Sequence, residues 1–158
     1  MAFNWWKLLH LIGLAAFLAS HGVSIFALNR IRNVDLDRTK ILELISFSGL
    51  TTMPMYISLG LLILGGVGAG VTIDAFWQLW LTVSIAILLG TIALMTAIAS
   101  PYFKQITAAC EVRPSGVPRK SDEELDALLH SSKSTLINVI GSVGLLSILY
   151  LMIFKPWL

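Results

Sequence analysis

Two histidines, His10 and His21, lie in the first long apolar stretch of the chain, which runs from Trp5 to Leu28. Burying an ionisable side chain in such a stretch is costly, so each histidine marks a hypothetical functional site. At about 100° per residue, their spacing leaves the two side chains about 20° apart around a helix and about 16 Å apart along it. Both imidazoles therefore face one side of the helix, and we expect that side to point into a helix bundle.

The chemistry open to these histidines includes metal binding. Imidazole on the inner face of a bundle is a common axial ligand of haem, so the first hypothesis is a b-type haem held by His10 or His21 in a redox or haem-related role. One histidine with two or three methionines equally suits Cu(I), a soft ion. Depth along antiparallel spans places Met53, Met55 and Met95 near His21, which gives the second hypothesis, copper handling at these four residues.

A third hypothesis needs no cofactor. Neutral imidazole still requires hydrogen-bond partners for its ring nitrogens, and Lys7 or Trp6 near His10 and Asn138 near His21 are candidates. Methionines more often fill gaps in a core than bind metals. The chain is then a non-catalytic scaffold or an accessory subunit of a membrane complex. The sequence assigns no catalytic residue and leaves open whether the protein is an enzyme.

Composition identifies the class of protein. Of the 158 residues, 56% are hydrophobic and only 13% are charged, and the mean hydropathy is +0.83. Soluble domains usually carry about 25% charged residues, so the chain belongs in a lipid bilayer. It has room for about four spans of roughly 20 residues each, which predicts a single all-α domain, an antiparallel bundle of four transmembrane helices. Cys110 is the single cysteine and has no intramolecular disulfide partner.

Four apolar stretches are the predicted spans, at about residues 5–28, 49–71, 76–100 and 135–154. The first continues to a stop at Asn29, Arg30 and Arg32, which is typical of a span and not of a cleaved signal. Residues 33–47 mix charged with apolar side chains and should lie at the membrane surface or lead into the second span. Pro54 should kink the second span, and Pro101 should close the third.

The connections carry further signals. Very few residues join the second and third spans, so we expect these spans to be antiparallel neighbours. Glycines before this turn indicate either a close helix contact or fraying of the helix, and we prefer fraying; they are Gly65, Gly66, Gly68 and Gly70. Residues 101–134 form the long polar loop, in which Ser121 and Glu124 should cap a short surface helix. His130, at the end of that helix, should be solvated.

The basic residues predict the orientation. Nine of the eleven flank the first and third connections, and only Lys7 and Lys155 lie elsewhere. The positive-inside rule then makes those two connections and the short helices beside them cytoplasmic, and places both termini on the outer side of the plasma (inner) membrane. The expected partners are the lipid bilayer, other membrane subunits or a second copy of the chain. Nucleic acid is not expected, because the basic residues follow the membrane flanks.

Several short motifs, in this order and spacing, carry a family resemblance: KLLHLIGLAAFLASHG followed by LNRIR, then DEELDALL before the last span, and MIFKP at the end. The chain resembles a bacterial family of four-helix inner-membrane proteins of unknown function, which is distantly similar to the membrane part of copper-resistance D proteins. The resemblance covers nearly the whole chain and implies the fold and the location. His10, His21 and Gly22 match the histidine-bearing first span.

The chain is more weakly similar to the four-helix protoporphyrinogen oxidase of bacteria. Lys7, Leu9 and His10 match the start of that family's first span. The tryptophan- and arginine-containing continuation of that family is absent, since residues 16–27 read differently. The resemblance therefore supports a histidine-bearing first span and does not extend to the oxidase activity.

Overall fold

The computed structural model describes residues 1–33, 35 and 37–156. Within them the chain forms one 3₁₀ turn, η1, and six α-helices: α1 (Ala2–Ile31), α2 (Arg38–Leu50), α3 (Thr52–Thr72), η1 (Ala75–Trp77), α4 (Leu79–Cys110), α5 (Asp122–Leu129) and α6 (Ser132–Phe154). In this described part, four helical segments are long and apolar enough to cross a membrane: Ala2–Ile31, Arg38–Thr72, Leu79–Cys110 and Asp122–Phe154. The predicted class, an all-α multi-pass membrane bundle of four spans, is confirmed.

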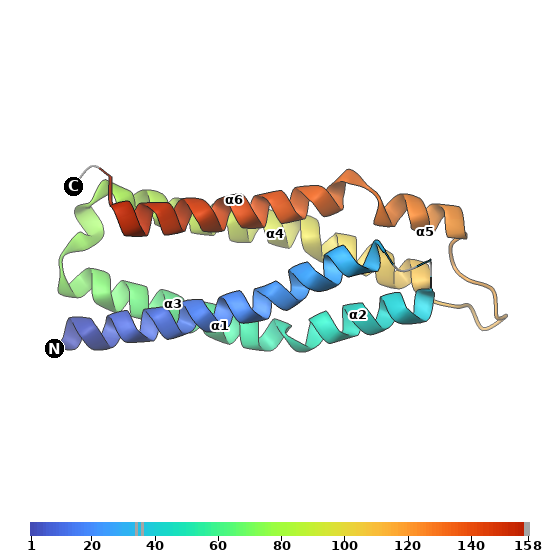
Figure 1. Cartoon of the computed structure of the whole chain (residues 1–158), viewed down its shortest axis with the longest axis horizontal. Helices are drawn as coiled ribbons and strands as arrows, with labels where there is room; N and C mark the ends of the chain where they lie inside the picture. The colour runs from blue at the N-terminus through green and yellow to red at the C-terminus, as the bar shows by residue number, and fades with distance from the viewer. Residues whose placement is uncertain (34, 36, 157–158) are drawn as a thin grey trace.

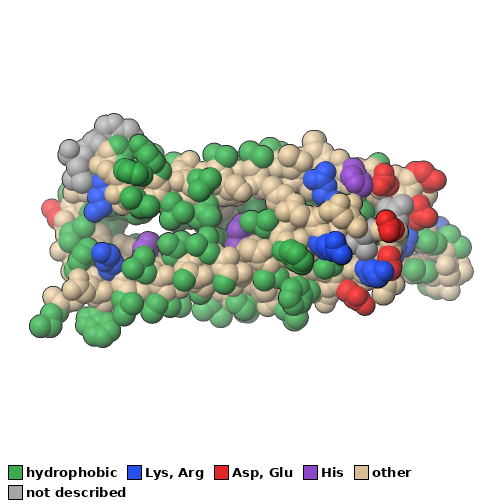
Figure 2. All heavy atoms as spheres, in the orientation of Figure 1, with side chains coloured by type: hydrophobic (Ala, Val, Ile, Leu, Met, Phe, Trp, Pro, Cys, Tyr) green, Lys and Arg blue, Asp and Glu red, His purple; other side chains and the backbone are tan. Residues whose placement is uncertain are grey.

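The four segments run up and down, so both termini lie at one end of the molecule, together with η1 (Figure 1). We call this the terminal end. The opposite end holds α2, α5 and the loop between α4 and α5, and charged side chains gather there (Figure 2). We call it the polar end. Helix α1 packs mainly against α3, and α4 packs mainly against α6, so the bundle consists of two helix pairs.

The prediction that spans two and three are neighbours is wrong along their length. Helix α3 packs along α1 instead, and α4 along α6. The turn η1 contacts both α3 and α4 and bridges the two pairs at the terminal end. Its side chain at Ala75 is buried, whereas Trp77 is 89% exposed. The short connection therefore joins α3 and α4 at one end, but the two helices do not pack against each other along their length.

Two prolines behave differently. The kink expected at Pro54 is confirmed as a break at Thr51 between α2 and α3, and Pro54 lies in the first turn of α3, where a helix needs no backbone donor. The expectation that Pro101 ends the third span is wrong, because α4 continues to Cys110. Beyond Pro101 the helix buries Tyr102 and Ile106 in the core at the polar end. The free energy gained by burying these side chains outweighs the loss of the one backbone hydrogen bond that an interior proline removes.

The core at the polar end draws side chains from α1, α2, α4, α5 and α6, and its largest buried members are Leu28, Ile31, Ile41, Tyr102, Ile106, Leu125 and Leu129. The predicted capping of the surface helix is confirmed in α5. The Glu124 backbone N–H donates to Ser121 Oγ (3.2 Å), and the Ser121 backbone N–H donates to Glu124 Oε2 (3.1 Å). As expected, His130 beside α5 is exposed.

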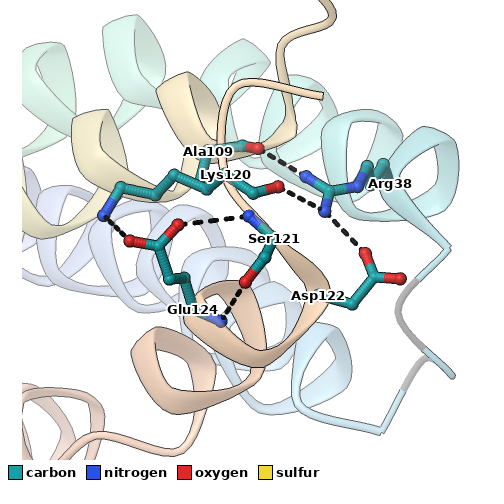
Figure 3. A network of polar contacts seen from close by, with 6 residues as sticks. All are labelled: Arg38, Ala109, Lys120, Ser121, Asp122 and Glu124. Atoms are coloured by element: carbon teal, nitrogen blue, oxygen red, sulfur yellow. Dashed lines mark hydrogen bonds and ion pairs between the residues drawn. The ribbon is translucent and has the colours of Figure 1, made fainter. Parts of the chain in front are cut away.

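Arg38 ties the loop between α4 and α5 to the bundle (Figure 3). Its guanidinium donates to the Ala109 carbonyl (2.6 Å), the Lys120 carbonyl (2.9 Å) and the Asp122 carboxylate (2.6 Å). The Arg38 side chain is only 15% exposed, whereas that of Asp122 is 67% exposed. The planar guanidinium donates to three acceptors, one near the end of α4 and two at the start of α5 or just before it. Arg38 of α2 therefore holds these two segments together.

Candidate functional site

Helices α1 and α3 approach closely because glycines remove the side chains between them. A Cβ added at Gly13 would overlap the backbone of Leu62, and one added at Gly65 would overlap the backbone of His10. The Trp6 ring occupies the corresponding space at Gly68. The preferred interpretation of these glycines as a frayed end is wrong, since α3 continues to Thr72. Gly65, Gly66 and Gly68 form a close contact with α1, which small residues permit in membrane bundles, whereas Gly70 faces Phe76 of η1.

This contact fixes the imidazole of His10. Its Nδ1 lies 2.7 Å from the Leu62 carbonyl oxygen, which only accepts hydrogen bonds, so Nδ1 carries the proton and donates it. The ring also fits against Gly66, where an added Cβ would lie 3.0 Å from Nδ1 and 3.2 Å from Cε1. In the neutral ring the lone pair then resides on Nε2, the atom on the far side of the ring from this hydrogen bond.

His21 turns to other helices. A Cβ added at Gly141 of α6 would lie 3.5 Å from His21 Nε2 and 4.0 Å from the Cε atom of Met95 in α4. The His21 ring stacks on Phe17, with centroids 5.4 Å apart and planes 12° from parallel. The side chain therefore reaches from α1 to the other helix pair.

A cavity of about 40 Å³ lies beside His21, and its lining includes Ser24, Met95, Asn138 and Gly141. Asn138 Nδ2 donates to the Asn29 side-chain oxygen at 2.9 Å. Asn138 Oδ1 is buried and has no hydrogen-bond partner among the residues that the structure describes. A buried acceptor left in this state is costly unless a small polar ligand or water reaches it.

The structure gives the predicted site residues different surroundings. His10 lies against α3, and His21 lies against α6, so the two rings belong to different sites. Met95 lines the same cavity as His21, as its depth along the predicted third span suggested. Met53 is 68% exposed, and the cavity lining includes neither Met53 nor Met55. The ligand role of each of these residues stays a prediction.

An opening separates the α1–α3 pair from the α4–α6 pair toward the terminal end. In the space-filling view the background is visible between the two pairs, and histidine side chains lie along the edge of the opening (Figure 2). Two basic residues belong to the helix ends here, Lys7 in the second turn of α1 and Lys155 directly after α6. Lys155 lies over the Trp80 ring, with Nζ 5.3 Å from its centroid.

Some site residues gave no clear sequence signal. The Leu62 carbonyl is a backbone group, which no side-chain pattern reveals. Asn29 looked like part of the stop after the first span, and its pairing with Asn138 joins residues far apart in the chain. Gly141 follows Asn138 by about one helical turn, a spacing that places both on one face and was the available clue.

Comparison of the chain with protein-family models, curated proteins and solved structures finds no match. Its class therefore rests on the fold and the composition. The protein is an all-α, multi-pass membrane protein in which His10 and His21 lie between helices of the bundle.

Proposed function

We propose that this membrane protein binds b-type haem in the opening between its two helix pairs, with His10 as an axial ligand. The observation that carries the proposal is the 2.7 Å hydrogen bond from His10 Nδ1 to the Leu62 carbonyl. Histidines that ligate metals usually donate their second ring N–H to a carbonyl or carboxylate, which fixes the ring and leaves Nε2 as the ligand. His10 has this arrangement before any ligand binds.

The surroundings of His10 suit a large, flat and mostly apolar ligand. The opening lies between two helix pairs, the usual place for a cofactor in a helix bundle. Lys7 and Lys155 are at the same end, where their positive charges would pair with the two carboxylates of a haem. Haem supplies a one-electron redox centre, whose potential depends on its axial ligand, on hydrogen bonds to that ligand and on burial.

His21 is a poorer candidate for the haem ligand. Pockets for ligands larger than a few atoms usually measure roughly 300–1,000 Å³. The cavity beside His21 is about 40 Å³. The copper hypothesis is also less well supported by the geometry, because only His21 and Met95 of its four residues share that cavity.

The test is the absorption spectrum and metal content of protein purified in detergent from haem-replete cells. The informative variant is His10→Asn, because its amide nitrogen replaces Nδ1 and keeps the bond to Leu62 while no ligand nitrogen remains. We expect a Soret band in the wild type, in His21→Asn and in the exposed control His130→Asn, and its loss in His10→Asn.

Three results would contradict the proposal. They are a colourless wild-type protein without haem, a Soret band that survives in His10→Asn, and copper in place of iron. A colourless, metal-free protein with unchanged folding would favour the scaffold hypothesis.

A further inference from the structure

A surface groove of about 310 Å³ lies at the polar end, between α6 and the end of α1. These two helices belong to different pairs, since α1 packs mainly against α3 and α6 against α4. One side of the groove is a face of α6, made by residues three or four positions apart: Thr135, Asn138, Val139, Ser142 and Val143. The other side is Arg32, which directly follows α1. The groove therefore lies along the seam between the two helix pairs.

The lining changes in character along the groove. Arg32 and Thr135 are nearest the polar end, whereas Val139 and Val143 lie one and two turns further along α6. These valines are 50% and 57% exposed. The eight steps from Thr135 to Val143 rise about 12 Å along the helix axis. Because the predicted fourth span begins at about residue 135, the groove starts at the headgroup boundary and continues into the hydrocarbon.

Arg32 is the charged side chain of this groove, and its charge has no carboxylate partner in the described part of the chain. Other lysine and arginine side chains at the polar end do pair with carboxylates, namely Arg38, Lys40, Arg119 and Lys120. No acidic residue lines the groove. A partly buried guanidinium at the headgroup boundary is therefore left to bind an anion, and its planar fork matches two oxygens of a phosphate.

We propose that this groove binds an anionic phospholipid from the leaflet at the polar end. The Arg32 guanidinium and the Thr135 hydroxyl hold the phosphodiester, and an acyl chain lies along Val139 and Val143. Basic pockets between transmembrane helices are a known form of lipid site. A zwitterionic phospholipid brings an additional ammonium group, and the groove has no carboxylate to receive it. The site therefore prefers the anionic class.

A lipid suits the groove better than a soluble anion does. A soluble phosphate pairs with Arg32 but leaves the exposed valines of the groove uncovered, whereas a phospholipid supplies the charge and the apolar chain in one molecule. The groove is at the opposite end of the bundle from Lys7 and Lys155, where the haem proposal places its carboxylates. This inference therefore goes beyond the proposed function and does not depend on it.

The test is native mass spectrometry of the detergent-purified protein, which measures the affinity for the first bound lipid. The probes are dioleoyl phosphatidylglycerol, which is anionic, and dioleoyl phosphatidylcholine, which is zwitterionic and has the same acyl chains. We expect the anionic lipid to bind at least about fivefold more tightly, because one basic residue near an anionic headgroup contributes about 1 kcal/mol. Glycerol phosphate in excess, a headgroup without acyl chains, should not displace it.

Arg32→Gln is the informative variant, because it keeps a long polar side chain and removes the charge. It should abolish the preference for the anionic lipid. Arg30→Gln is the matched control, since Arg30 lies two residues away, is exposed and does not line the groove. The control should keep the preference of the wild type.

A second pair of variants tests the part of the groove that receives the acyl chain. Ser142→Phe places a ring in the groove and should weaken binding of the anionic lipid. Leu146→Phe is its control, because Leu146 lies one turn further along α6, is 64% exposed and is outside the groove lining. Binding to this control should match that of the wild type.

Three results would overturn the proposal. Equal affinities for the two lipids would mean that lipid surrounds the bundle without a specific site. An equal loss of preference in Arg32→Gln and Arg30→Gln would indicate diffuse positive charge, and displacement by glycerol phosphate would indicate a site for soluble anions. Circular dichroism and thermal unfolding in detergent establish that each variant is folded. A colourless protein that keeps its lipid preference would contradict the haem proposal alone.

Discussion

The two ends of this bundle are built on different principles. At the polar end five helices enclose a continuous core, in which Ile31, Ile41, Ile106 and Leu125 are completely buried. Toward the terminal end the bundle consists of two separate pairs, α1 with α3 and α4 with α6, with an opening between them (Figure 2). One end is closed and held by side-chain packing, whereas the other leaves space within the molecule.

The difference has a physical cause. The polar end faces water, where burying apolar side chains is favourable in proportion to the area removed from solvent. Between helices in lipid this driving force is missing, because acyl chains are as apolar as leucine. Close contact there depends on small residues such as Gly13 and Gly65, which serve the α1–α3 pair. Side-chain packing therefore holds the helices in place at the closed end, whereas the open end keeps a space between the two pairs.

The largest expected effect comes from the closed end. Leu125→Ala removes a side chain that is 0% exposed from the core. Truncating a buried leucine costs about 2–5 kcal/mol of unfolding free energy, through lost burial and the cavity left behind. Reversible unfolding in detergent micelles measures it. Leu136→Ala is the control, because Leu136 is 46% exposed, and an equal loss in both variants would mean that the polar end is not a packed core.

A smaller effect is expected where the α1–α3 pair depends on glycine. Gly65→Ala forces a methyl group into the backbone of His10, and overpacking of this kind costs about 1–3 kcal/mol. Gly60→Ala on the same helix is the matched control, since its Cβ meets nothing within 4 Å. The control should be neutral or slightly stabilising. Equal unfolding free energies for the two variants would argue against the close contact.

The smallest effect concerns the cap of α2 at the polar end. The Asp37 carboxylate accepts from the backbone N–H groups of Thr39 and Lys40, and the backbone N–H of Lys40, followed by its ammonium, holds the pKa of Asp37 below its ordinary value of 3.8. Between the two pKa values the unfolded state binds more protons than the folded state. This contribution to stability is complete above pH 3.8 and is lost as the pH falls through the lower, folded-state pKa.

Comparison of the wild type with Asp37→Asn at about pH 5 and about pH 3 therefore separates the cap from the other carboxylates. Asp37→Asn keeps an acceptor for the same backbone groups and removes the titration, so it should lose less stability than the wild type on acidification. If the unfolding free energies of the wild type and of Asp37→Asn had the same pH dependence, the negative charge of the Asp37 carboxylate would contribute nothing to stability.

Local features of the fold were predictable where they depend on neighbours in the chain. The α5 cap follows from Ser121 and Glu124 three residues apart, and the break before Pro54 follows from the geometry of proline. Pro101 and Gly65 were misjudged because their outcomes depend on distant partners. The side chains beyond Pro101 bury themselves in the polar-end core, and Gly65 meets α1.

The sequence by itself determined that the chain has four apolar segments able to span a membrane and that His10 and His21 share a helix face, because hydropathy and helical periodicity are local properties. The tertiary structure alone decided that α3 is the neighbour of the first half of α1 and that α6 and α4 receive His21. In lipid every apolar face is compatible with every other, so the choice of partner depends on where glycines let two backbones approach. That choice directed one imidazole to a backbone carbonyl and the other to a small, mostly apolar cavity.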